Sequence, residues 1–401
     1  MASRELPEEL LLRIFQSVHR NALPNISLAC RSFQRIVNPV LYADVALGEI
    51  ADVVAFCRCV IAAGEEVGRL VHSIYIYGCE SASTQPYVEV SNARKLVVAA
   101  SRLTTQLQSF TCLLLWLTDL DLYVALCEIP TLRRLRLSVA YRDWHEPEPT
   151  TSNLSLPLSS LPPPNLEYLM VQDRPGGDIA AGFYRFLGVA MSGPALQEVV
   201  IIATYRKDKL LFPSFKFSPT NPHVSSSLRA ITVSALSAKV THVLRQCPHI
   251  RTLSIYGNTQ ASDLEHVLHT EPHSAIQLET LCCRSQVLVS CASNRVFHGL
   301  IHVELDSVAY PCMNAVLDGF VDSWLPSYRD FPVPPKDVLS SAAAYANTLQ
   351  YLSFGIRDPW LIAWADNMDV IPTFPALRTC VVAISARRRH ATVSIFHAQS
   401  C

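Results

Sequence analysis

Cysteines are the residues of this sequence best suited to metal binding and nucleophilic chemistry, and the chain has 13 of them. The only tight pairs are Cys57-x-Cys59 and Cys282-Cys283. Neither has a second pair at the spacing of a zinc site. In a reducing compartment these thiols would be free and mostly buried as small apolar groups. We therefore expect no metal ion and no cofactor.

Two further pairs of polar residues have spacings that suit chemistry. His266 and His269 lie three residues apart on an expected helix, although such histidines more often sit on a solvated face. Asp119 and Asp121 would share one side of a strand as paired carboxylates, although a charged strand edge explains them more simply. The sequence contains no G-x-S-x-G, P-loop, H-E-x-x-H or kinase signature. We therefore expect a non-catalytic protein; the enzyme alternative is a hydrolase or transferase with an unrecognised site.

Composition narrows the class of protein further. Half of the 401 residues are hydrophobic and 17% are charged, so the chain is not disordered. A net charge of −1 supplies no basic field for nucleic acid. The longest apolar runs are short, and Cys112–Leu117 is far below the roughly 18 residues of a membrane span. The charged N-terminus does not resemble a signal peptide. We expect a cytoplasmic or nuclear protein that binds neither nucleic acid nor membrane.

A short pattern, apolar-x-x-apolar-x-apolar, recurs along the chain and indicates repeated strands. Its eleven copies are Val71–Ile76, Leu107–Cys112, Leu132–Leu137, Leu166–Val171, Leu196–Ile201, Leu228–Val233, Ile250–Ile255, Leu278–Cys283, Leu300–Leu305, Leu349–Phe354 and Leu377–Val382. The steps between first positions run from 22 to 49 residues. Stretches between them, such as 179–192 and 240–247, have helical spacing. Strands that alternate with helices predict an α/β fold with parallel strands.

The pattern resembles the L-x-x-L-x-L core of leucine-rich repeats, whose period is 20–29 residues. The resemblance implies a solenoid with parallel strands on the concave face and helices outside. The repeats are degenerate, because several steps are longer and the usual asparagine after the strand is mostly missing. A doubly wound α/β domain is the alternative, but it would want a glycine-rich turn, and there is no G-x-G-x-x-G.

Three stretches interrupt the repeats, at 146–164, 207–227 and 324–336. The first two are rich in proline, serine and threonine, which predicts loops or extended insertions. Two interpretations remain open: partner-binding loops at the rim of the solenoid, or plain surface insertions.

The N-terminal residues 5–40 predict two or three short helices. Pro7 suits a first helical turn, Glu8 and Glu9 follow at the positive end of the helix dipole, and Asn38-Pro39 suits a stop. An apolar stripe follows helical spacing at Leu10, Leu11, Ile14, Phe15 and Val18. So few helices cannot bury this surface alone. The segment is either a cap on the solenoid or a docking module.

The order of residues favours docking, because the segment resembles the F-box family over residues 4–46. The elements of the resemblance are Leu6-Pro7-x-Glu9-Leu10-Leu11-x-x-Ile14-Phe15, Leu28-x-Cys30-Arg31-x-Phe33 and Pro39-x-Leu41-Tyr42. The last element looks like the ending common in fungal members, while the tryptophan that many F-boxes carry is absent. The resemblance implies binding to the Skp-type adaptor of a cullin-RING ubiquitin ligase, with Leu6, Pro7, Leu10, Ile14 and Phe15 as contacts.

Together these patterns predict three parts: an F-box-like helical module at 1–46, a degenerate leucine-rich-repeat solenoid at 47–385, and a C-terminal tail at 386–401. The chain would be the substrate-recognition subunit of a Skp–cullin–F-box ligase and would bind a target protein. The expected target contacts lie between the repeated apolar positions: Ser73, Tyr75, Arg134, Arg136, Tyr168, Met170, Glu198, Thr252, Ser254, His302, Glu304, Tyr351 and Ser353. The alternative is a repeat scaffold that never joins a ligase.

Overall fold

The structure is a computed structural model of a mixed helix and strand protein. It describes residues 6–77, 87–113, 120–139, 164–173, 193–202, 226–233, 244, 247, 249–255, 276–293, 296–305, 335–357, 374–386 and 389–397. The chain forms two compact units, Met1–Ser227 and Leu228–Cys401.

The first unit begins with short helices, as the sequence predicts. They are α1 (Glu8–Ser17), the 3-10 turn η1 (Arg20–Ala22), α2 (Leu23–Ala29) and α3 (Arg31–Ala43). Their small core consists of Phe15, Leu23, Ile36 and Val37. The predicted stop at Asn38-Pro39 is wrong, because α3 continues through Pro39 to Ala43. A proline removes one backbone donor, and here only a single helical turn follows it.

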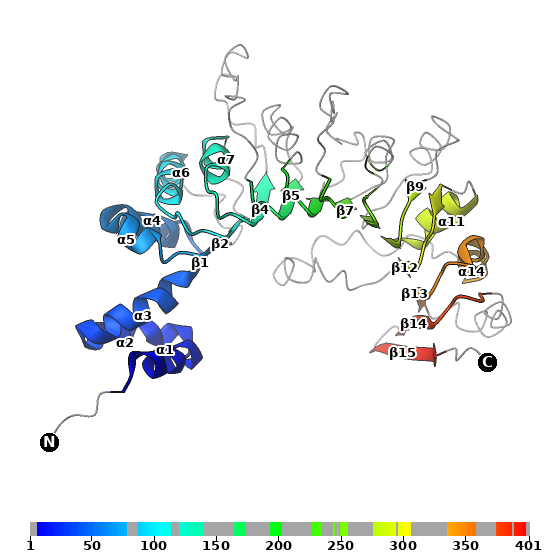
Figure 1. The fold of residues 1–401 in the computed structure, drawn as a ribbon, viewed down its shortest axis with the longest axis horizontal. Coiled ribbons are helices and arrows are strands. Elements are labelled where there is room, and N and C mark those ends of the chain that lie inside the picture. The colour runs from blue at the N-terminus through cyan, green and yellow to red at the C-terminus, as the bar shows by residue number, and fades with distance from the viewer. Residues whose placement is uncertain are drawn as a thin grey trace, which may run out of the picture. The chain divides into compact units, whose positions relative to one another are not determined.

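In the described part of the first unit, six parallel strands follow, each paired with the next along the chain. They are β1 (Asp44–Leu47), β2 (Ser73–Ile76), β3 (Ser109–Cys112), β4 (Arg134–Val139), β5 (Tyr168–Asp173) and β6 (Glu198–Ile202). The intervening helices are α4 (Ile50–Ala63), α5 (Glu65–Gly68), α6 (Tyr87–Ser101) and α7 (Leu120–Cys127). Figure 1 shows α4, α6 and α7 on one side of strands β1 to β4. This arrangement buries the inward side chains of the strands against the helices.

The second unit continues the same design. Its main strands are β7 (Ala230–Val233), β8 (Thr252–Ile255), β10 (Thr280–Cys283), β12 (His302–Leu305), β13 (Tyr351–Arg357) and β14 (Thr379–Ala386), all parallel. A small parallel pair joins β9 (Ile276–Gln277) to β11 (Phe297–His298). The helical elements are α11 (Ser285–Ser293), α14 (Pro335–Ala342) and the 3-10 turn η4 (Ala343–Tyr345).

The C-terminal segment departs from the predicted tail. Arg389–His397 form β15, which pairs antiparallel with β14, with Ala386 opposite Arg389. Its sequence alternates Ala391, Val393 and Ile395 with polar residues, and that period of two suits a strand. The segment carries no copy of the repeated pattern, so it was not predicted to be a strand.

Every one of the eleven predicted strand segments contains a strand, which confirms the parallel-strand prediction. In the first unit the central apolar positions pair in one row from strand to strand: Ile74, Phe110, Leu135, Leu169 and Val199. All five are buried. β1 was not predicted, because Asp44–Leu47 lacks the full pattern.

Other predictions fall differently. The strand expected around Asp121 is wrong, because Leu120–Cys127 is helix α7. The helix predicted at 179–192 lies outside the described residues, as do His266, His269 and nearly all of the three insertions.

Polar side chains just before the repeated pattern join successive repeats. Thr131 Oγ1 lies 2.8 Å from the carbonyl oxygen of Leu107, and Asn165 Nδ2 donates to the carbonyl oxygen of Pro130 at 2.8 Å. In the second unit, Thr348 Oγ1 makes the same kind of bond to Leu300 O at 2.8 Å. Each donor immediately precedes the first apolar residue of a repeat. These side chains therefore satisfy backbone carbonyls of the preceding repeat, which buried packing requires.

Candidate docking and binding surfaces

Helix α1 exposes large apolar side chains along one stripe. Leu10 and Ile14, four residues apart and therefore on one helix face, are 46% and 47% exposed. Leu6, just before the helix, is 54% exposed, and Pro7 is exposed beside it. Four of the five predicted adaptor contacts thus lie together on the surface.

Phe15, the fifth predicted contact, has a different position. It is only 5% exposed and packs edge-on against Phe33, with ring centroids 5.4 Å apart at 72°. Together with Leu23, Ile36 and Val37 it forms the core of the helical module. The structure places Phe15 inside the module, so it holds the helices together rather than extending the exposed stripe.

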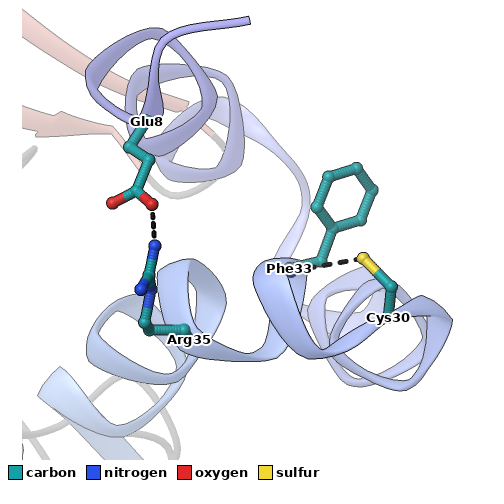
Figure 2. Close-up of polar contacts among 4 residues, drawn as sticks. All are labelled: Glu8, Cys30, Phe33 and Arg35. Carbon is teal, nitrogen blue, oxygen red and sulfur yellow. Dashed lines mark hydrogen bonds and ion pairs between the residues drawn. The ribbon is translucent and has the colours of Figure 1, made fainter. Parts of the chain in front are cut away.

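Two polar contacts orient the helices of the module around that core. Figure 2 shows Arg35 of α3 paired with Glu8, the first residue of α1. It also shows the Cys30 thiol accepting the backbone N–H of Phe33 at 3.4 Å, which caps the start of α3. The ion pair is exposed and contributes little stability by itself. It nevertheless joins the start of α1 to the middle of α3.

Leu28, in α2, is the most exposed large apolar residue of the described chain, at 82%. Leu28 belongs to one of the motif elements but is not among the predicted contacts. A helix of only seven residues gives a weak periodic signal, so nothing in the pattern showed which way Leu28 points. We call Leu6, Leu10, Ile14 and Leu28 the exposed apolar set.

The predicted target contacts lie in two rows across the parallel strands. We call these outward positions, which alternate with the buried apolar ones, the strand face. In the first unit the rows are Ser73, Ser109, Arg134, Tyr168 and Glu198, then Tyr75, Thr111, Arg136 and Met170. In the second unit they include Thr252, Thr280, His302 and Tyr351, then Ser254, Cys282, Glu304 and Ser353. The register thus brings together residues that are far apart in the sequence.

Three named members of the strand face are covered despite their register. Met170 is 2% exposed, Thr111 6% and Ser254 9%, so none of them offers much surface to a partner. Ser109 and Thr111 are register neighbours that the prediction omitted. They occupy the same two positions of the repeated pattern in Leu107–Cys112, so the pattern itself could have found them.

The strand face of the first unit carries two arginines of β4. The guanidinium carbon of Arg136 lies 5.1 Å from the ring centroid of Tyr168, a cation–π contact, and Arg134 is exposed beside it. Burial raises the pKa of the Glu198 carboxyl, and Arg136 and Arg134 partly lower it again. The two arginines of β4 and Glu198 of β6 therefore interact electrostatically across β5.

The second unit has a different set of side chains on its strand face. The His302 ring stacks on Tyr351, with centroids 4.1 Å apart at 7°, and His302 Nε2 lies 3.7 Å from a carboxylate oxygen of Glu304. The Cys282 thiol donates to the other oxygen of Glu304 at 3.7 Å. Burial raises the pKa of Tyr351. This cluster thus combines two stacked rings with one carboxylate.

In each tight cysteine pair, one thiol is buried and the other is more exposed. Cys57 is buried and Cys59 is exposed on α4, while Cys283 is buried and Cys282 half-buried on β10. Burial raises the pKa of the Cys57 thiol to about 12, which keeps it protonated at neutral pH. Among the described residues, no group of three or more His, Cys, Asp or Glu is placed to hold a metal ion.

None of the helices that the structure describes has the length and apolarity needed to span a bilayer.

Residues 4–47 match the family model described as F-box-like. Helices α1 to α3 therefore form an F-box-like domain, and F-box domains generally bind Skp-type adaptors. No curated protein matches the chain.

Proposed function

We propose that this chain is the substrate-recognition subunit of a Skp–cullin–F-box ubiquitin ligase. The F-box-like helices would dock the Skp adaptor, and the strand face would bind a target protein. In this proposal the parallel strands belong to a degenerate leucine-rich-repeat solenoid of the kind that follows fungal F-boxes. The observation that carries the proposal is the exposed apolar set on a domain that matches the F-box-like model.

The physics of recognition supports the docking role. Interfaces that seat a helix in a groove concentrate their binding energy in a few large apolar anchors. Leu10 and Ile14 supply two such anchors on one face of α1, and Leu6 adds a third at its start. Water-exposed leucine clusters of this kind mark interaction sites on soluble proteins.

The strand region would supply specificity and no chemistry. Each parallel strand presents its outward residues at fixed register, so a target can contact several repeats at once. The ligase would then act by holding the target close to the ubiquitin-carrying enzyme, and the reacting groups would belong to other subunits.

Co-purification of the full chain with the Skp adaptor tests this function. Wild type should retain the adaptor. Leu10→Asp should lose it, because the substitution puts a charge where the complex would bury an apolar anchor, at a cost of about 2 kcal/mol or more in binding free energy. Ile61→Asp is the matched control, since Ile61 is a 38% exposed apolar helix residue of α4, outside the F-box-like domain. Failure of folded wild type to retain the adaptor would contradict the proposal and favour a scaffold outside any ligase.

A further inference from the structure

We propose that the strand face of the first unit recognises a single carboxylate side chain of its target, held by Arg134 and Arg136. The occupant is an acidic, unphosphorylated protein segment that carries aspartate or glutamate at this position. The inference rests on the proposed role of the strand face in target binding and adds the chemical class of the target.

The register fixes the spacing of the two arginines. Arg134 and Arg136 occupy alternate positions of β4, so their backbones lie about 7 Å apart on the same face. β3 places the short side chains of Ser109 and Thr111 directly beside them. The arginines therefore stand next to a strand whose side chains neither cover nor neutralise them.

Tyr168 orients one of the two guanidinium groups. Its ring lies 5.1 Å from the guanidinium carbon of Arg136, which limits the directions in which that side chain can point. Arg134, two residues before Arg136 and on the same face, is exposed. A pre-oriented guanidinium loses less freedom when it binds a carboxylate through two parallel hydrogen bonds.

Two other surface arginines that lie beside strands have carboxylate partners within the chain. Arg133, the residue before Arg134, pairs with Glu167 at 3.4 Å, and Arg251 pairs with Glu279 in the second unit. The structure shows no ion pair between Arg134 or Arg136 and any described residue. An exposed Arg134 beside an Arg136 that is held by Tyr168 would suit a carboxylate of a partner.

The charge balance favours a monoanion over a phosphate. With Glu198 ionised, the cluster of Arg134, Arg136 and Glu198 has two positive charges and one negative charge, so its net charge is +1. One carboxylate brings this sum to zero, whereas a phosphate near its full charge would leave it negative beside Glu198. In the second unit, the two rows of the strand face named above contain Glu304 and no lysine or arginine, so an acidic segment is better matched by the first unit.

Degenerate peptide libraries test the proposal on the full chain. Three fluorescent libraries share random flanks and differ at a fixed central residue, which is glutamate, glutamine or phosphoserine. Wild type should retain the glutamate library about tenfold more than the glutamine library, equivalent to about 1.4 kcal/mol. It should also prefer glutamate to phosphoserine.

Charge reversal provides the matched variants. Arg134→Glu/Arg136→Glu should lose the preference for glutamate and gain one for a fourth library with central lysine. Arg133→Glu, a charge reversal one residue away and off the strand face, should leave the preference unchanged. Glu198→Gln removes the nearby carboxylate and should bring retention of the phosphoserine library up to that of the glutamate library.

The outcomes separate this inference from the proposed function. Equal retention of glutamate and glutamine, preference of wild type for phosphoserine, or no retention of any library would each overturn the inference. Adaptor binding is measured on the same preparations. If wild type binds the adaptor without preferring glutamate, only the inference fails. If it prefers glutamate without binding the adaptor, only the ligase role fails.

Discussion

The F-box-like helices and the parallel strands treat their large apolar side chains in opposite ways. Seven large hydrophobic residues of the described chain are exposed, and Leu6, Leu10, Ile14 and Leu28 are four of them. The repeated apolar positions of the strands, from Val71 to Cys380, are buried. The helices thus leave a surface to be completed by a partner, whereas the strands complete their own core.

The difference follows from how each region is built. A strand of the repeat has a neighbour at its side and helices over its inner face, so its apolar residues are covered within the chain. The helical module has a core of four buried residues, and its short helices cannot cover both of their faces. Apolar surface on such a module is therefore where an interface is to be sought.

Phe110→Ala should have the largest effect on the strand side of this comparison. Phe110 is fully buried on β3, and its truncation leaves a cavity that costs about 4 kcal/mol of unfolding free energy. Adaptor binding should persist at low temperature, because the F-box-like helices have their own core. Urea unfolding followed by circular dichroism measures the loss, and loss of adaptor binding by the folded variant would break the comparison.

Phe15→Ala tests the helical side. The residue packs against Phe33 in the small core, so the variant should lose about 3 kcal/mol from the helical module and lose adaptor binding with it. Hydrogen exchange of α1 to α3 reports the first effect and co-purification the second. Leu10→Ala is the control, since it should weaken adaptor binding without changing exchange. Normal protection of the helices in Phe15→Ala would show that Phe15 is not a core residue.

Thr131→Val sharpens the account of how repeats are joined. The substitution keeps the shape of the side chain but removes the hydroxyl that lies 2.8 Å from Leu107 O. We expect a loss of about 1 kcal/mol in the unfolding free energy of the first unit. Thr348→Val should do the same in the second unit, where the corresponding bond runs to Leu300 O. An unchanged unfolding midpoint in both variants would remove these side chains from the account.

Glu198→Gln should have the smallest effect, and of the opposite sign. Burial raises the pKa of Glu198 in the folded state, so its contribution to stability is greatest below the unfolded pKa and falls as pH rises through the folded pKa. The variant avoids that loss and should melt about 1 °C higher at neutral pH. The difference should vanish in acid, where both side chains are neutral. Thermal melts across this pH range measure the difference in melting temperature. A lower melting temperature of the variant at neutral pH would contradict the prediction.

The sequence predicted the strands well because their signal is a burial pattern. A residue such as Leu135 or Leu253 must be apolar wherever a neighbouring repeat covers it, so the spacing survives even in degenerate copies. β15 was not predicted, because it is held by antiparallel pairing with β14 and not by a repeat. Asp121 was misplaced because two nearby aspartates say nothing about whether the backbone around them is helical.

The sites were harder to predict, because helical spacing reveals a stripe but not what covers it. Phe15 and Ile14 are adjacent apolar residues of one helix, yet the first faces the core and the second faces solvent. Met170 shows the same problem on a strand, since its register is that of Arg136 while its side chain is buried. Which face is covered depends on tertiary packing, and that information is absent from a single sequence.

Calorimetric titration of a purified Skp adaptor into the full chain would measure docking itself. The account predicts saturable binding to wild type with a negative heat-capacity change, because the exposed apolar set would be buried. It also predicts that Leu10→Asp, folded as wild type is, gives no saturable heat. Absence of binding by folded wild type, or equal binding by Leu10→Asp, would contradict the claim that these helices dock an adaptor.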